Sequence, residues 1–304
     1  MPVVLFAHRR PAVLRDTLAC LRGCGIGRLY VFADGPRNAG DTEGVAGVRE
    51  VINGIDWTET VIVEHPENRG LSASIQAGLD MVFARHDAAV VIEDDIQVSP
   101  EFFAYACAAL EHYASSQAVA GVTGLRLPFD PSVLTGYPYD VFLSPRFSSW
   151  AWATWRDRWQ SFDFDAASLR RRIAAGGLEA RRAGADMPRM IDQAVVKETL
   201  GGAWDTFCAT NMLLSGQSFI TPAWNMVDYA GYEDGTHHSG EPDWKLHWET
   251  ERRPSSAEEI RFAPAEPDQR VLRAYLDFLD PPGVRAAIRR LLRRWPPAAA
   301  GRPA

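Results

Sequence analysis

The sequence predicts a doubly wound α/β domain, in which helices cover both faces of a largely parallel sheet. Over the first hundred residues, four short apolar runs alternate with segments whose apolar residues recur at helical spacing. The fourth run, AAVVI (88–92), is continuously apolar, as expected of a strand that is buried on both faces. The chain has 304 residues, 46% of them hydrophobic, which is enough to bury a large core.

The predicted elements follow one another in strand–helix order. Strands are expected where short apolar runs end in turn residues, at 2–7, 28–33, 60–64 and 88–92. Helices are expected between them, around 13–21, 43–52 and 71–82. A further helix is expected over 101–113, because Ser99-Pro100 is a typical N-cap and first-turn pair.

Beyond this helix the regular alternation fades and aromatic residues dominate. Trp150, Trp152, Trp155 and Trp159 lie close together, and a charged helical stretch at 166–183 precedes a second aromatic segment at 204–220. The last stretch contains a short basic helix and a Pro/Ala-rich tail. We therefore divide the chain into an α/β half at 1–125, a second half of the same domain at 126–250, and a C-terminal extension at 251–304.

Charge and cysteine content exclude several classes of function. The formal net charge of −7 provides no basic field for nucleic acid. The four cysteines form no CxxC pair, which argues against a zinc site or a disulfide framework and fits a reducing compartment. No apolar run approaches the roughly 20 residues that a membrane-spanning helix needs. A soluble, cytoplasmic protein is expected.

Polar, charged and glycine residues gather directly after the predicted strands. In open α/β sheets, ligands bind outside the carboxyl ends of the strands. The loops that are expected there carry Arg9-Arg10, Asp34, Asn68-Arg69-Gly70 and Glu93-Asp94-Asp95. These residue types are suited to a phosphorylated, hydroxyl-rich ligand.

The acidic triplet Glu93-Asp94-Asp95 is the most informative of these loops. Consecutive carboxylates after a buried strand repel one another, so they are either solvated loop acids or compensated by a cation. Mn²⁺ and Mg²⁺ prefer oxygen ligands and can bridge a carboxylate to a diphosphate. The position of the triplet after the fourth strand favours the cation.

Several segments together resemble GT-A glycosyltransferases, and more narrowly the family-2-like bacterial sugar transferases related to the N-acetylglucosaminyltransferase I type. They are FAHRRP, FADGPR, ENRGLSASIQAGLD, VIEDDIQVSPEFFAYACAALEHY, SSWAWATWRDRWQSFD and GYEDGTHHSG, covering about residues 2–240. The resemblance implies a Rossmann-like three-layer α/β/α sandwich with a central mixed, mainly parallel sheet. It implies Mn²⁺- or Mg²⁺-dependent, inverting transfer of a hexosyl or N-acetylhexosaminyl group from a nucleoside-diphosphate sugar, with UDP favoured. The acceptor would be a glycan, lipid-linked or protein hydroxyl, in the biosynthesis of a surface polysaccharide, lipopolysaccharide or glycoprotein glycan.

The resemblance also assigns roles around the donor, which the half at 1–125 would bind. Asp95 would be the metal ligand, Asp94 would bind the ribose hydroxyls and Glu93 the donor sugar. Asp34 would bind the imide N–H of a uracil-like base, although a turn-forming Asp-Gly-Pro explains it equally well. Arg10 would pair with the diphosphate, unless it is a solvated loop residue. Asn68 and Gly70 would approach the nucleotide, with helix capping as the alternative for Asn68.

The half at 126–250 would bind the acceptor. The resemblance makes Asp205, in the segment GGAWDTFCATNMLL, the expected general base. Asp157, Asp163 and Asp165 compete for this role, and each is alternatively an ordinary surface or N-cap acid. Trp152 is the tryptophan expected to stack on a sugar, although close Trp residues are more often core packing. His237, in the loop 231–240, would be a further metal or phosphate contact or an ordinary surface histidine. The basic helix at the C-terminus is either solvated or interdomain, or lies peripherally on an anionic membrane.

Two other functions are weighed against sugar transfer. A sugar nucleotidyltransferase also places acids around a metal, but it needs a glycine-rich phosphate loop after the first strand, and HRRP has no glycine. A non-catalytic carbohydrate-binding module with the GT-A fold is the other alternative. The intact triplet argues against it, because such costly carboxylates would then have no cation to justify them.

Overall fold

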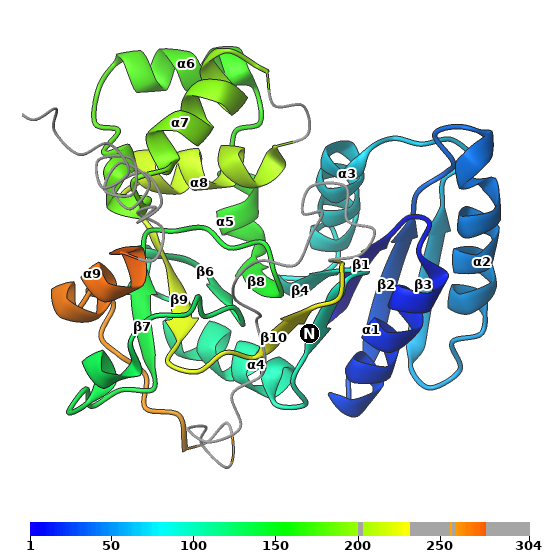
Figure 1. The fold of residues 1–304 in the computed structure, drawn as a ribbon, viewed down its shortest axis with the longest axis horizontal. Coiled ribbons are helices and arrows are strands. Elements are labelled where there is room, and N and C mark those ends of the chain that lie inside the picture. The colour runs from blue at the N-terminus through cyan, green and yellow to red at the C-terminus, as the bar shows by residue number, and fades with distance from the viewer. Residues whose placement is uncertain (200–202, 232–255, 257–258, 278–304) are drawn as a thin grey trace, which may run out of the picture.

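The computed structural model describes residues 1–199, 203–231, 256 and 259–277. Its centre is an eight-stranded sheet with the strand order β3-β2-β1-β4-β8-β6-β9-β7. A separate two-stranded antiparallel sheet pairs β10 with β5. Figure 1 shows the large sheet running across the molecule with helices on both sides.

The first half of the chain alternates strands and helices as predicted. Its parallel strands are β1 (Val3–Ala7), β2 (Arg28–Ala33), β3 (Glu59–Glu64) and β4 (Ala88–Glu93). Its helices are α1 (Pro11–Gly23), the short η1 (Ala39–Asp41), α2 (Thr42–Asn53), α3 (Leu71–Phe83) and α4 (Phe102–Tyr113). The short β5 (Ile96–Val98) follows β4 after a two-residue turn.

The second half adds four strands to the same sheet, two of them antiparallel to the strands of the first half, and a group of short helices. The added strands are β6 (Val119–Thr123), β7 (Val141–Ser144), β8 (Trp152–Trp155) and β9 (Ser218–Pro222), whereas β10 (Val227–Tyr229) lies in the separate sheet with β5. The helical segments are η2 (Pro131–Leu134), α5 (Arg156–Gln160), α6 (Ala166–Ala174), η3 (Ala180–Ala183), α7 (Met187–Ile191), η4 (Asp192–Val196), α8 (Trp204–Leu214) and α9 (Gln269–Asp277). Because β8 pairs antiparallel with both β4 and β6, it joins the two halves of the sheet.

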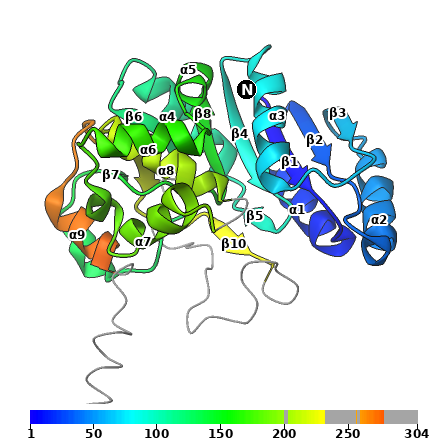
Figure 2. The same ribbon diagram turned by 90° about the horizontal axis from the view of Figure 1, so that it is seen from above.

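Each face of the sheet has its own hydrophobic core. Side chains of α1, α2, α4 and α9 pack on one face, and those of α3, α5, α6, α7 and α8 on the other. Figures 1 and 2 show these helices as separate layers on either side of the strands. The predicted three-layer α/β/α sandwich with a central mixed, mainly parallel sheet is therefore confirmed. No helix among the described residues is long and apolar enough to cross a membrane.

The carboxyl ends of β1, β2 and β4 lie at one edge of the sheet. These three strands are parallel, and β1 lies between the other two with Phe6 opposite both Phe32 and Glu93. The loops that leave these ends therefore converge, as the sequence predicted.

Candidate active site

The acidic triplet occupies the tight turn from β4 to β5. Glu93 is the last residue of β4, and Asp94 and Asp95 form the turn, with 4% and 8% of their surface exposed. The hydroxyl of Thr17 on α1 donates to the carbonyl oxygen of Asp94 (2.8 Å), and the amide of Ala230 donates to that of Asp95 (2.9 Å). The turn is therefore held from two sides, with its carboxylates largely withdrawn from water.

Arg10 neutralises two of these carboxylates. It follows β1 and directly precedes Pro11, the first residue of α1. Its Nη2 atom lies 2.5 Å from Oδ1 of Asp94 and 2.8 Å from Oδ2 of Asp95. The sequence predicts a diphosphate contact for Arg10, and the structure places its guanidinium on the carboxylates of the triplet.

The pKa values of Glu93 and Asp94 indicate that Arg10 does not neutralise all the carboxylates of the site. Burial raises the pKa of Glu93 well above its usual value, and the charges of Asp95, Asp94 and Asp205 raise it further. Burial also raises the pKa of Asp94 to about 6, against the opposing effect of Arg10. One guanidinium thus does not compensate the acids gathered here.

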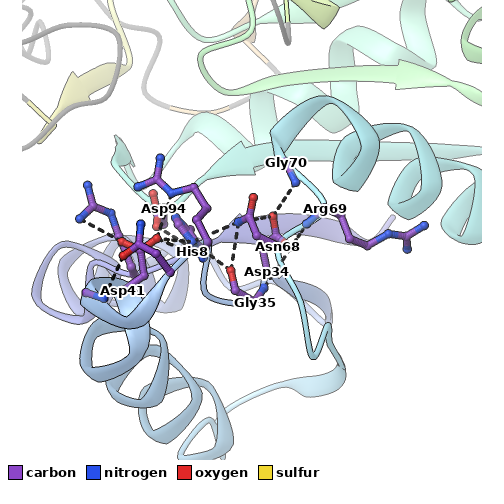
Figure 3. Close-up of polar contacts among 12 residues, drawn as sticks. His8, Asp34, Gly35, Asp41, Asn68, Arg69, Gly70 and Asp94 are labelled. Carbon is purple, nitrogen blue, oxygen red and sulfur yellow. Dashed lines mark hydrogen bonds and ion pairs between the residues drawn. The ribbon is translucent and has the colours of Figure 1, made fainter.

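Asp34, directly after β2, organises the loop before α3. Its carboxylate accepts hydrogen bonds from four protein N–H groups: the amides of Gly35 (3.0 Å), Arg69 (2.8 Å) and Gly70 (3.0 Å), and the Nδ2 group of Asn68 (2.9 Å). Figure 3 shows Asp34 surrounded by these donors. A carboxylate has about four acceptor positions, so protein donors already fill those of Asp34.

Asn68 and Gly70 adopt conformations that the sequence did not predict in detail. Asn68 does not cap α3, because its Nδ2 group lies against Asp34, the Gly35 carbonyl (3.0 Å) and Nε2 of His8 (3.2 Å). Gly70 is the N-cap of α3 and has φ of 79°, a left-handed conformation that favours glycine. Both residues therefore shape the loop at the carboxyl ends of β1 and β2.

His8 and Asp41 belong to the same network and were missed as site residues. The His8 amide donates to Oδ2 of Asp94 (3.2 Å), so His8 links the loops after β1, β2 and β4 (Figure 3). Asp41 is 3% exposed and binds Arg37 (2.9 Å) and Arg9 (3.3 Å). His8 stands in HRR beside Arg10, a signal that could have been used, whereas nothing in the sequence singled out Asp41.

Asp205 comes to the acidic triplet from the opposite half of the chain. It lies in the first turn of α8, and its charge is one of those that raise the pKa of Glu93. The competing aspartates have other partners. Asp165 caps α6 through the amides of Ala167 and Ser168, Asp163 accepts from the Asp165 amide, and Asp157 pairs with Arg158. Of the four candidates for the base, Asp205 is the one whose charge raises the pKa of Glu93.

Trp152 has no surface for a sugar, which corrects the expectation that it stacks on one. It is completely buried in the core between the sheet and α8, against Phe147, Trp159, Trp204 and Phe219. The reason is its place in β8, in the middle of the large sheet. The alternative interpretation, in which the close tryptophans pack in the core, is correct for Trp152.

Trp150 has a different environment. It is half-buried and stacks on Tyr229 of β10, with ring centroids 4.7 Å apart. Ala151, between the two tryptophans, has φ of 51°, a left-handed conformation that few non-glycine residues adopt. The strained backbone at Ala151 marks the place where the chain leaves the stacked Trp150 and enters β8.

The chain passes directly over Asp95 as it leaves β10. A Cβ atom on Gly231 would come within 2.7 Å of Oδ2 of Asp95, and closer still to the hydroxyl of Tyr229. A larger residue here would have to displace the Tyr229 ring, the Asp95 carboxylate or the chain itself. His237, predicted in the loop that begins at Gly231, lies outside the described residues, as does the basic C-terminal helix.

The residues of the triplet fit a divalent cation. Within the described ranges, no group of three or more His, Cys, Asp or Glu side chains is arranged as a complete cage for a metal ion. However, Mg²⁺-type ions are typically bound by one or two carboxylates together with substrate phosphates. Asp94 and Asp95 provide such carboxylates, beside acids that Arg10 alone does not neutralise.

Comparison with known proteins does not identify a family for this chain. No family model matches the chain, and no curated protein matches it. Among solved structures, a mannosyltransferase from Pyrobaculum calidifontis, in complex with GDP-Man and Mn²⁺, is similar with a TM-score of 0.37 and 13% identity. The match covers 69% of this chain and 73% of that one. This likeness is too low to carry an argument about function.

Proposed function

We propose that this protein is a metal-dependent glycosyltransferase that uses a nucleoside-diphosphate sugar, and we take UDP as the nucleotide because the sequence resemblance favours it. The observation that carries the proposal is the convergence of the loops after β1, β2 and β4. They bring Arg10, Asn68 and the acidic triplet to one edge of the sheet, with Asp205 supplied by α8. Cationic, amide and carboxylate groups at that edge suit the diphosphate and the hydroxyls of such a donor.

In the proposed mechanism, Asp94 and Glu93 bind donor hydroxyls, and Asp95 would hold the Mn²⁺ or Mg²⁺ ion. The ion would offset the charge that develops on the diphosphate as it leaves. A protonated Glu93 carboxyl, which the raised pKa favours, can donate a hydrogen bond to a sugar oxygen as well as accept one. Arg10 pairs with the diphosphate through its guanidinium.

Asp205 is the proposed general base. Inverting transfer needs a carboxylate that removes the proton of the acceptor hydroxyl while its oxygen attacks the anomeric carbon. Asp205 is half-buried, its charge raises the pKa of Glu93, and its Oδ1 atom accepts a hydrogen bond from the Thr206 amide (2.7 Å). These observations support Asp205 as the base.

The role of Asp205 can be tested by separating turnover from binding. A panel of UDP- and GDP-sugars with Mn²⁺ is assayed for release of the nucleoside diphosphate, with glycan acceptors added in turn. For the best pair, Asp205→Asn should reduce turnover by about a hundredfold or more without weakening donor binding. Asp163→Asn, a neighbouring acid of the same half, is the matched control and should leave turnover unchanged. Equal turnover of Asp205→Asn and wild type would remove Asp205 as the base.

A further inference from the structure

Arg10 makes an unusual contact for a residue that is expected to bind phosphate. One nitrogen atom, Nη2, bridges Asp94 and Asp95, whose side chains are 6% and 11% exposed. A cation that binds both carboxylates must therefore compete with this guanidinium. In the described structure, the counter-cation of the triplet is part of the chain itself.

The surroundings of Arg10 allow this contact to be exchanged. Its guanidinium has hydrogen bonds to Asp94 and Asp95 and to no other group among the described residues. The side chain is 21% exposed and rises from a loop, so it can turn away while α1 stays in place. A diphosphate offers a guanidinium the same kind of bidentate partner as a pair of carboxylates.

The neighbouring charged groups lack this freedom. Asp34 is saturated by four N–H donors of the protein. Asp41 holds Arg37 through both the backbone amide and the side chain, and Arg9 pairs with Asp41 instead of the triplet. A metal ion could therefore replace Arg10 as the partner of the carboxylates, while a diphosphate replaces the carboxylates as the partner of Arg10. No charge would lose its compensation in this exchange.

We propose that Arg10 is an exchangeable counter-cation, which neutralises Asp94 and Asp95 in the unloaded protein and leaves them for the diphosphate when metal and donor bind. This inference rests on the proposed function and adds an order of binding to it. The metal ion alone binds weakly, because it must displace Arg10 without giving the guanidinium a new partner. The nucleotide supplies that partner, so the metal ion and the nucleotide bind cooperatively.

The proposal predicts opposite effects of one substitution in two binding measurements. Mn²⁺ is titrated into the protein without nucleotide, and free Mn²⁺ is measured by electron paramagnetic resonance. Arg10→Ala should bind Mn²⁺ alone about tenfold or more tighter than wild type, because the internal competitor is gone. The same variant should bind UDP in the presence of Mn²⁺ about tenfold or more weaker, because the diphosphate loses its partner.

Arg9→Ala is the matched control for the Mn²⁺ titration. It removes the same charge one residue away, but from the ion pair with Asp41. It should leave the affinity for Mn²⁺ alone unchanged. Equal tightening in both variants would overturn the proposal, because a general loss of positive charge would then explain it.

A second readout guards against misfolding of the variants. Arg10→Gln keeps most of the side chain, and its thermal unfolding midpoint should rise with added Mn²⁺ more than that of wild type. Unchanged or weaker binding of Mn²⁺ alone by folded Arg10→Gln and Arg10→Ala would overturn the exchange. Failure of wild type to bind any nucleotide would instead refute the proposed function, while the Mn²⁺ titration would still test Arg10 as a competitor.

Discussion

Replacement of Asp34 tests whether this residue holds the loops of the site together. Asp34 is 7% exposed and accepts from three backbone amides and from Asn68. A hydrogen bond to a charged group contributes about 1.5–3 kcal/mol, and neighbouring bonds are not additive. Water can reach part of the loop once the carboxylate is gone. We therefore expect Asp34→Ala to lower the free energy of unfolding by about 3–5 kcal/mol.

The measurement is equilibrium unfolding in urea at pH 7, with Asp165→Ala as the control. Asp165 accepts from two amides at the exposed start of α6, so its loss should cost only about 1 kcal/mol. Asp34→Asn should be nearly as damaging as Asp34→Ala, because its NH₂ group would face N–H donors. A cost for Asp34→Ala no larger than that for Asp165→Ala would refute this account of the loop and leave Asp34 free to bind a base.

Three further predictions concern the tryptophans, the half-buried thiol of Cys24 and the glycine over Asp95. Trp152→Ala should lower the free energy of unfolding in urea by about 3–5 kcal/mol, because Trp152 is completely buried. Replacement of the half-buried Trp150 by Ala should cost about 2 kcal/mol or less. Similar costs for the two variants would contradict the assignment of Trp152 to the core. Burial raises the pKa of the Cys24 thiol to about 11, so labelling by iodoacetamide, followed by mass spectrometry, should increase with pH towards 11 and be slow at pH 8 in the folded protein. Labelling as fast as in urea would show that the thiol is not shielded. Gly231→Ala should weaken Mn²⁺-dependent nucleotide binding in calorimetry, because its methyl group would displace Asp95 or the chain above it, and an unchanged affinity would contradict that contact.

The first half of the fold was predictable because its signals are local. The β2 strand lies at Arg28–Ala33 as expected, and α1, α2 and α3 fall where apolar residues recur at helical spacing. The second half was not predictable in the same way. Strands such as β8 and β9 are short, and they are stabilised by neighbours that are distant in sequence: β8 lies between β4 and β6. Gly176 and Gly177, both with positive φ, separate α6 from η3 in the stretch expected to be one charged helix.

The candidate site was predictable in its location but less so in its contacts. Because strands alternate with helices, the loops after β1, β2 and β4 had to meet at one edge, and they do. Hydrogen-bond partners are set by exact backbone positions, which a sequence pattern does not specify. The four donors to Asp34 and the bridge from Arg10 to Asp94 and Asp95 are of this kind, as is the burial of Trp152.

Calorimetric titration with UDP and GDP, each with and without Mn²⁺, tests the central claim that this edge of the sheet is a nucleotide and metal site. Wild-type protein should bind UDP tightly only when Mn²⁺ is present, and Asp95→Ala should lose this binding while it keeps its fold by circular dichroism. Binding of neither nucleotide to the folded wild-type protein under any condition would contradict the claim, as would undiminished Mn²⁺-dependent binding of UDP by Asp95→Ala.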